Sequence, residues 1–188
     1  MPADRLFVAI PLPAPVREQL AALYETSGSI AWTRPEQLHL TLRFLGEVGP
    51  EWTDSFGDAL ELVQVEPFVL PVTGLGVFPP RGQARVIWIG VGHGHPRLYQ
   101  LRQQIDDALL GTGFPLDVRI FHPHVTLGRL PPSGPATAAA EFLKRHRDFE
   151  ASPIRVDTFR LYQSDLRPGG AVHTLRREFD LRLRSSSS

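Results

Sequence analysis

Two stretches of the sequence repeat one pattern, in which a histidine and a threonine stand two positions apart among aliphatic residues. The stretches are His39-Leu40-Thr41-Leu42 and His124-Val125-Thr126-Leu127. The alternation of apolar and polar residues predicts a β-strand in each case. Because successive strand side chains point to opposite faces, the histidine and threonine of each copy share one face. Each copy therefore presents an imidazole beside a hydroxyl group on a rigid surface.

Two imidazoles that face one substrate can divide the work of acid–base catalysis. An unperturbed imidazole titrates near a pKa of about 6.5, so the neutral base and the charged acid coexist near neutral pH. If the two strands are neighbours, His39 and His124 can supply a general base and a general acid without a metal ion. Thr41 and Thr126 can then donate hydrogen bonds to an anion. The structural alternative is a hydrogen-bonded strand histidine beside a threonine that simply favours a strand.

The doubled motif resembles that of the 2H phosphoesterases, which are named for two such motifs. Five stretches further resemble the branch of RNA 2′,3′-cyclic phosphodiesterases, also called 2′-5′ RNA ligases. In order they are RLFVAIPLP, WTRPEQLHLTLRFLGEV, VFPPRGQARVIWIGV, FHPHVTLGRL and LYQSDLRPGGAVHTL. The resemblance covers residues 5–183, which is nearly the whole chain.

The resemblance implies a specific reaction. A 2′,3′-cyclic phosphate at an RNA end would be hydrolysed to a 2′-phosphomonoester, and an RNA 5′-hydroxyl in place of water would give a 2′-5′ linkage. His39 is then the proton donor to the leaving 3′-oxygen, and His124 is the proton acceptor from water. The cyclic phosphate already carries the activation, so we expect neither ATP nor another cofactor, and no metal.

Two arginines are candidates for holding the phosphate. Arg43 continues the alternation of His39 and Thr41, so we expect its guanidinium on the same face. Arg129 breaks the alternation of the second copy and reaches that face only if Gly128 marks a β-bulge. An arginine at this position is common in the family that the chain resembles. The alternative for Arg43 is a solvated residue near the end of its strand.

Aromatic residues before the first motif are candidates for contacts with RNA bases. Phe7 and Trp32 could stack on unpaired bases, because aromatic faces tolerate any base. Packing in the core is the alternative, and we favour it for Phe7. His122 shares the alternation of His124, but Pro123 interrupts the stretch, and the resemblance implies a variable position there.

The remaining sequence predicts alternating strands and helices. Further strands are expected at residues 5–11, 67–78, 84–91, 117–121, 154–163 and 171–183, and helices at 13–28, 51–65, 96–110 and within PPSGPATAAAEFLKRH. Paired strands without crossover helices favour an antiparallel α+β fold over a doubly wound parallel sheet. The order resembles one half repeated twice, with one motif in each half. The resemblance likewise implies two lobes related by a pseudo-twofold axis around a central cleft, in one domain at residues 1–184.

Composition limits the possible partners. The chain of 188 residues has no cysteine, and its formal net charge is zero. Disulfides and thiolate chemistry are therefore excluded, and RNA would have to bind a local patch. No segment reaches the roughly 18 apolar residues of a membrane span, so we expect a cytoplasmic protein that binds RNA ends, avoids membranes and is monomeric. Residues 185–188 are expected to be a tail.

Three functions remain open at this point. The first is cyclic phosphodiesterase activity on RNA ends. The second keeps the two-histidine chemistry but acts on small cyclic nucleotides or 2′-5′ oligonucleotides. The third is an RNA-end binding module without turnover, which the intact histidines of both motifs argue against.

Overall fold

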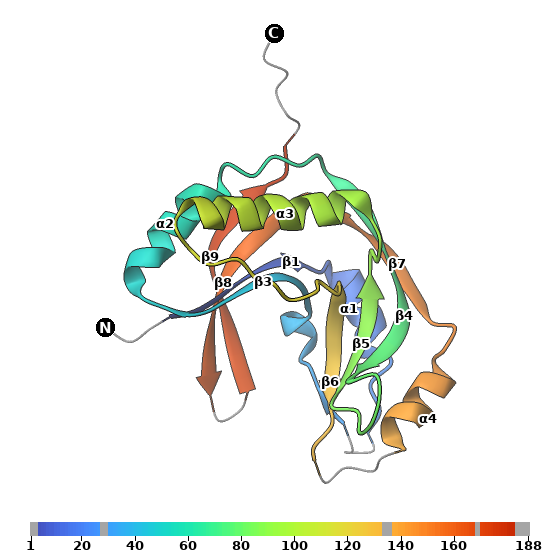
Figure 1. Ribbon diagram of the computed structural model, residues 1–188. Helices are drawn as coiled ribbons and strands as arrows, with labels where there is room; N and C mark the ends of the chain where they lie inside the picture. The colour runs from blue at the N-terminus through green and yellow to red at the C-terminus, as the bar shows by residue number, and fades with distance from the viewer. Residues whose placement is uncertain (1–3, 27–29, 133–136, 168–169, 183–188) are drawn as a thin grey trace.

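The protein is described by a computed structural model that covers residues 4–26, 30–132, 137–167 and 170–182 (Figure 1). Among these residues, nine antiparallel strands form one sheet. The strands are β1 (Asp4–Pro11), β2 (Ala31–Trp32), β3 (His39–Val48), β4 (Phe68–Phe78), β5 (Val86–Val91), β6 (His124–Arg129), β7 (Glu150–Val156), β8 (Thr158–Arg167) and β9 (Gly170–Asp180). Their order is β7-β4-β5-β6-β3-β1-β8-β9, and the short β2 pairs with β6 outside this path.

The two strands that begin with the motif histidines are neighbours at the centre of the sheet. Their ladder consists of one residue pair, Leu40 opposite Val125. Each strand then continues into its own half of the sheet, where β3 pairs with β1 and β6 pairs with β5 over most of their lengths. The strand order is symmetric about this junction, with three further strands on each side.

Four α-helices cover the sheet: α1 (Ala14–Ala21), α2 (Pro50–Leu60), α3 (Pro96–Gly111) and α4 (Ala138–Arg145). A 3₁₀ turn at Pro35–Gln37 precedes β3. The long helix α3 lies across the sheet, with α2 beside its C-terminal end (Figure 1). Its buried side chains include Leu98, Leu101, Ile105 and Leu109, whose spacing of three and four residues forms one apolar stripe.

The core lies on the face of the sheet that the motif histidines do not use. Leu40 and Leu42 of β3 and Val125 and Leu127 of β6 are almost fully buried there. Burying each such side chain contributes about 1.5–3 kcal/mol relative to leaving it exposed. The aliphatic positions of the two motifs thus anchor the strands, while the alternate positions stay available for chemistry.

Most of the expected elements are present, and four differ from the structure. The helix expected at 51–65 ends at Leu60. Residues 117–121 form no strand, because Val118 and Ile120 are 94% and 97% exposed on a loop outside the sheet. The strand expected at 154–163 is two strands, β7 and β8, which are separated at Asp157. The helix expected at 13–28 ends at Ala21.

Two further expectations concern the chain ends and membranes. The tail expected at residues 185–188 lies outside the described residues. Within the described ranges, none of the helices has the length and apolar character needed to cross a membrane.

Candidate active site

The register of the central strands gathers the four motif side chains on one face. Leu40 and Val125 lie opposite each other and point into the core. Directly opposed residues share a face, and the flanking positions point the other way. His39, Thr41, His124 and Thr126 therefore lie together on the face opposite the core. All four side chains are half-buried.

Each histidine is oriented by the same backbone contact. The Nδ1 atom of His39 lies 2.6 Å from the carbonyl oxygen of Gln37, and Nδ1 of His124 lies 2.7 Å from that of His122. A carbonyl oxygen only accepts hydrogen bonds, so Nδ1 must carry the proton and donate in both rings. Nε2 is thereby left to accept a proton when the ring is neutral and to donate one when it is charged.

Burial sets the charge of both rings in the absence of substrate. It lowers the pKa of His39 to about 4, against a smaller opposing effect of the hydrogen bond to Gln37. Burial also lowers the pKa of His124, and the nearby positive charge of Arg129 adds to this. Both imidazoles are therefore mainly neutral near pH 7. An anion bound between them would raise both pKa values, so the proton-donating form requires the bound substrate.

A β-bulge after each threonine decides where the two candidate arginines point. In β3, Thr41 pairs with Ala9 and Arg43 with Val8, which leaves Leu42 as the extra residue. The bulge reverses the alternation, so Arg43 lies on the core face and is only 4% exposed. The expectation that Arg43 shares the face of His39 is therefore wrong. Phe44 occupies that face instead and is 54% exposed.

The second bulge has the opposite effect on its arginine. In β6, Thr126 pairs with Trp88 and Gly128 with Ile87, so Leu127 is the extra residue. Arg129 is thereby turned to the face of Thr126, where its side chain is exposed. The β-bulge that Arg129 requires to reach the face of Thr126 is therefore present. Its contact with phosphate stays a prediction.

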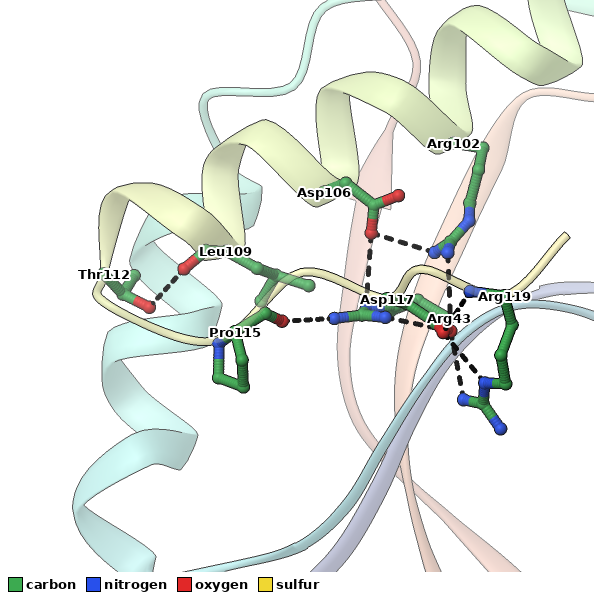
Figure 2. A network of polar contacts seen from close by, with 8 residues as sticks. All are labelled: Arg43, Arg102, Asp106, Leu109, Thr112, Pro115, Asp117 and Arg119. Carbon is green, nitrogen blue, oxygen red and sulfur yellow. Dashed lines mark hydrogen bonds and ion pairs between the residues drawn. The ribbon is translucent and has the colours of Figure 1, made fainter. Parts of the chain in front are cut away.

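Arg43 belongs to a buried ionic network behind the sheet (Figure 2). Its guanidinium lies 3.3 Å from Asp106 of α3 and 2.9 Å from Asp117, and it donates a hydrogen bond of 2.6 Å to the carbonyl oxygen of Pro115. Arg102 contacts the same two carboxylates, at 2.9 and 3.6 Å. The network ties α3 and the loop that precedes β6 to the back of β3. Arg43 therefore supports the site from behind.

Aromatic rings surround His39 on the front of the sheet. The ring of Phe7 lies 4.9 Å from that of His39 and stacks on Tyr162 at 5.3 Å. His173 of β9 meets His39 edge to face at 5.3 Å. Phe7 is only 3% exposed, as its packing alternative requires, so it supports the imidazole more than it offers a surface for a base.

His173 and Tyr162 were not found from the sequence. Tyr162 lies on β8, which pairs with β1 from a distant part of the chain, and His173 lies on β9, which pairs with β8. Burial lowers the pKa of His173, and its Nδ1 atom is buried without a hydrogen-bond partner among the residues that the structure describes. A neutral third imidazole therefore borders the site. The alternation within GAVHTL was the available signal, but it does not identify which residue the strand faces.

The surroundings of His124 are also aromatic. Phe78 of β4 lies 5.0 Å from its ring, and Trp88 of β5 lies 6.1 Å away. His122 contacts Trp88 at 4.7 Å and supplies the carbonyl oxygen that orients His124. Position 122 thus contributes through its backbone, whatever its side chain.

Trp32 lies away from the two histidines. Its ring stacks on Tyr24 at 4.7 Å and contacts Phe142 of α4 at 5.2 Å. Its indole nitrogen donates a hydrogen bond to the carbonyl oxygen of Glu25. Pairing of β2 with the C-terminal end of β6 places the ring beside α4. These contacts agree with the packing alternative for Trp32, and its contact with RNA bases stays a prediction.

A cavity of about 550 Å³ opens beside His39. Its near wall consists of Phe7, Tyr162 and His173, and its far wall is the turn between β7 and β8. None of the residues of β6 lines it, among the described residues. His39 therefore lines this cavity, and His124 is not among its lining residues.

Comparison with known proteins places this geometry in a family. The model of the 2′-5′ RNA ligase superfamily matches residues 12–168. An Aeropyrum pernix protein named RNA 2′,3′-cyclic phosphodiesterase is 36% identical over 138 residues, which are 73% of this chain and 78% of the relative. An Archaeoglobus fulgidus protein of the same name is 35% identical, over 94% of this chain and 99% of the relative.

Solved structures agree with these matches. The structure of Escherichia coli LigT in its apo form has a TM-score of 0.76 and 26% identity, over 97% of this chain and 99% of that one. A Thermus thermophilus protein has a TM-score of 0.77 and 28% identity, over 96% and 99%. E. coli LigT has also been solved with 3′-AMP, again with a TM-score of 0.76 and 27% identity, over 96% and 99%.

Proposed function

Because the chain belongs to the 2′-5′ RNA ligase superfamily, we propose that it is an RNA 2′,3′-cyclic phosphodiesterase that releases 2′-phosphomonoester ends. The observation that supports this most strongly is the single residue pair Leu40–Val125. It brings the two motifs together on one face, with both Nδ1 atoms held by backbone carbonyls and both Nε2 atoms available.

The two histidines act at opposite ends of one displacement. A water oxygen attacks phosphorus while Nε2 of His124 accepts its proton. The bond between phosphorus and the 3′-oxygen breaks, and Nε2 of His39 gives that oxygen a proton. The product has a 2′-phosphate and a 3′-hydroxyl, and each ring ends in the opposite protonation state. One proton exchange with solvent restores the starting state.

The threonines and Arg129 act on the phosphate itself. Charge builds on its non-bridging oxygens in the transition state, and preorganised donors at that place lower the barrier. Thr41 and Thr126 supply one hydroxyl donor from each strand. Arg129 supplies a positive charge from the side of His124. The anion also raises the pKa of His39, which charges the proton donor only when substrate is bound.

Ligation follows from the same geometry. If the 5′-hydroxyl of a second RNA replaces water, His124 accepts its proton and a 2′-5′ phosphodiester forms. Reversal of this step exchanges the roles of the two histidines. Strain in the cyclic phosphate supplies the driving force, so the reaction requires no ATP. The two halves of the sheet would act as the lobes of one domain, with the phosphate between them.

Incubation with a defined substrate tests the proposal. An RNA oligonucleotide ending in a 2′,3′-cyclic phosphate should gain one water in the presence of EDTA, and phosphorus NMR should identify a 2′-monoester. The variant His39→Ala/His124→Ala is the matched control. Conversion of small cyclic nucleotides alone would favour the second substrate class. Binding without conversion would indicate an RNA-end binding module. Activity that EDTA abolishes and a metal restores would contradict the two-histidine mechanism.

A further inference from the structure

We propose that the cavity beside His39 binds the RNA chain on the 5′ side of the cyclised nucleotide. This inference rests on the proposed function and deepens it, because it assigns the direction in which the substrate lies. It predicts that the enzyme acts more efficiently on RNA ends than on free cyclic mononucleotides. Three observations support it: the position of the cavity, its walls and its charge.

The position follows from the geometry of the displacement. The entering and leaving oxygens of a phosphoryl transfer lie roughly in line, on opposite sides of phosphorus. His124 receives the proton of the entering water, and His39 protonates the leaving 3′-oxygen. That oxygen belongs to the cyclised ribose, so the ribose lies on the side of His39. The 5′ chain continues from this ribose, and the cavity is the hollow that adjoins His39.

The walls of the cavity suit a nucleotide. Its volume of about 550 Å³ lies within the range of roughly 300–1,000 Å³ that small-molecule sites occupy. Tyr162 and His173 supply half-buried rings on the near wall, and unpaired bases stack on such rings. Gln37 holds β9 in place here, because its side-chain amide donates a hydrogen bond to the carbonyl oxygen of Ala171.

The charge of the cavity differs from that of the whole protein. Four arginines and two carboxylates line it, whereas the chain has 20 basic and 20 acidic residues in all. The arginines are Arg17, Arg34, Arg155 and Arg160, and the acids are Glu36 and Asp157. The guanidinium of Arg17 has no ion-pair or hydrogen-bond partner within the described part of the chain. An unpaired arginine on such a wall is suited to a backbone phosphate.

The test compares substrates of different length. The measured quantity is the ratio of kcat/KM for a four-nucleotide RNA with a cyclic end to kcat/KM for the corresponding cyclic mononucleotide. We expect this ratio to be about 10 or more in the wild type. Replacing the first linkage 5′ of the cyclised nucleotide by an uncharged methylphosphonate should remove most of the advantage, because single-stranded binding follows phosphate contacts.

The variant Arg17→Gln/Arg155→Gln removes two positive charges from the cavity wall. We expect it to lower the ratio by about 10-fold, and to reduce the dependence of the oligonucleotide KM on salt. Arg147→Gln/Arg182→Gln removes the same charge from exposed positions that do not line the cavity, and it should retain the wild-type ratio.

The outcomes separate this inference from the proposed function. A wild-type ratio near 1, or equal losses on both substrates in the cavity variant, would overturn the cavity assignment while leaving the phosphodiesterase intact. An equal fall of the ratio in the control variant would also overturn it, since charge at any position would then suffice. Failure of the wild type to hydrolyse either substrate would instead contradict the proposed function.

Discussion

The strand that begins at His39 and the strand that begins at His124 bulge at the same distance from the histidine, yet the bulges expose different residues. In β3 the bulge puts Arg43 behind the sheet and Phe44 in front. In β6 it puts Gly128 behind and Arg129 in front. A Cβ atom on Gly128 would lie 2.7 Å from Ile30 and 2.9 Å from Trp32, so close packing of the β2 region occupies the space that Arg43 uses in the other half.

The repeated motif suggests that both halves of the sheet do the same work, but the two bulges place different residues on the front of each half. Both halves orient an imidazole in the same way, and aromatic rings surround both histidines. The difference is that the front of β6 carries the exposed Arg129, whereas the cavity adjoins His39 of β3. Under the proposed function, the halves are equivalent for the proton transfers and unequal for the substrate, with Arg129 assigned to the phosphate charge and the cavity beside His39 assigned to the nucleotide.

Removing either imidazole should have the largest effect. A positioned acid or base contributes about 10²–10⁴-fold, so His39→Ala and His124→Ala should each lower kcat by that factor on a cyclic-phosphate oligonucleotide. The double variant should be little worse than the poorer single variant, because both groups act in one transition state. His93→Ala, at an exposed position, is the control. Near-wild-type turnover in either single variant would contradict the assignment of one proton transfer to each histidine.

The network behind β3 should matter for stability more than chemistry. Arg43→Leu leaves Asp106 and Asp117 short of a partner, and breaking a buried pair in this way costs about 3–5 kcal/mol. Arg119→Leu removes the exposed member of the network and should cost at most about 1 kcal/mol. Urea unfolding monitored by circular dichroism gives both values. Equal losses of unfolding free energy in the two variants would show that the burial of Arg43 does not increase its contribution to stability.

Acid should reveal how strongly burial lowers the pKa of the histidine in each half. The pKa of His39 is about 4 in the folded protein and about 6.5 in the unfolded chain. As the pH falls, the unfolded chain therefore takes up this proton at a higher pH than the folded protein does. The free energy of unfolding is unaffected above pH 6.5. It falls as the pH drops from there toward 4, by up to about 3 kcal/mol at about 1.4 kcal/mol per unit.

The variant His39→Gln should reduce this decrease in the free energy of unfolding with falling pH. Unfolding curves recorded between pH 7 and 4 measure the decrease. His124→Gln is the matched comparison in the other half. An equal or larger reduction in His124→Gln would contradict the large lowering of the pKa of His39.

Arg129 should give the smallest of these effects. Its charge is exposed, so Arg129→Gln should lower kcat/KM by about 10-fold without a change in thermal stability. Phe44→Gln removes the exposed residue at the corresponding position of β3, and it should leave the salt dependence of KM unchanged. If Phe44→Gln weakened the salt dependence as much as Arg129→Gln, the division of tasks between the halves would be wrong.

The sequence predicted what repeats locally and missed what depends on pairing. Both motif strands and α3 follow from their own alternation or spacing. The bulge that turns Arg43 inward is defined against β1, so a count along β3 alone gives the wrong face. Val118 and Ile120 looked like strand residues because they are apolar, although Asp117 binds Arg43 and the segment lies outside the sheet.

The site residues missed from the sequence have the same cause. Tyr162 and His173 reach His39 through β8 and β9, which join the sheet from the far end of the chain. Alternation within those strands cannot identify which neighbour they face.

The strand order also determines how the two halves can be assembled as the chain is made. The half that contains His124 uses β4, β5, β6 and β7, a continuous stretch of the chain from residue 68 to 156. The half that contains His39 combines β1 and β3 with β8 and β9. Folding during synthesis generally proceeds from the segments that emerge first, and contacts between distant segments form slowly. The cavity beside His39 is therefore completed only after β8 and β9 have followed the other strands of the sheet out of the ribosome.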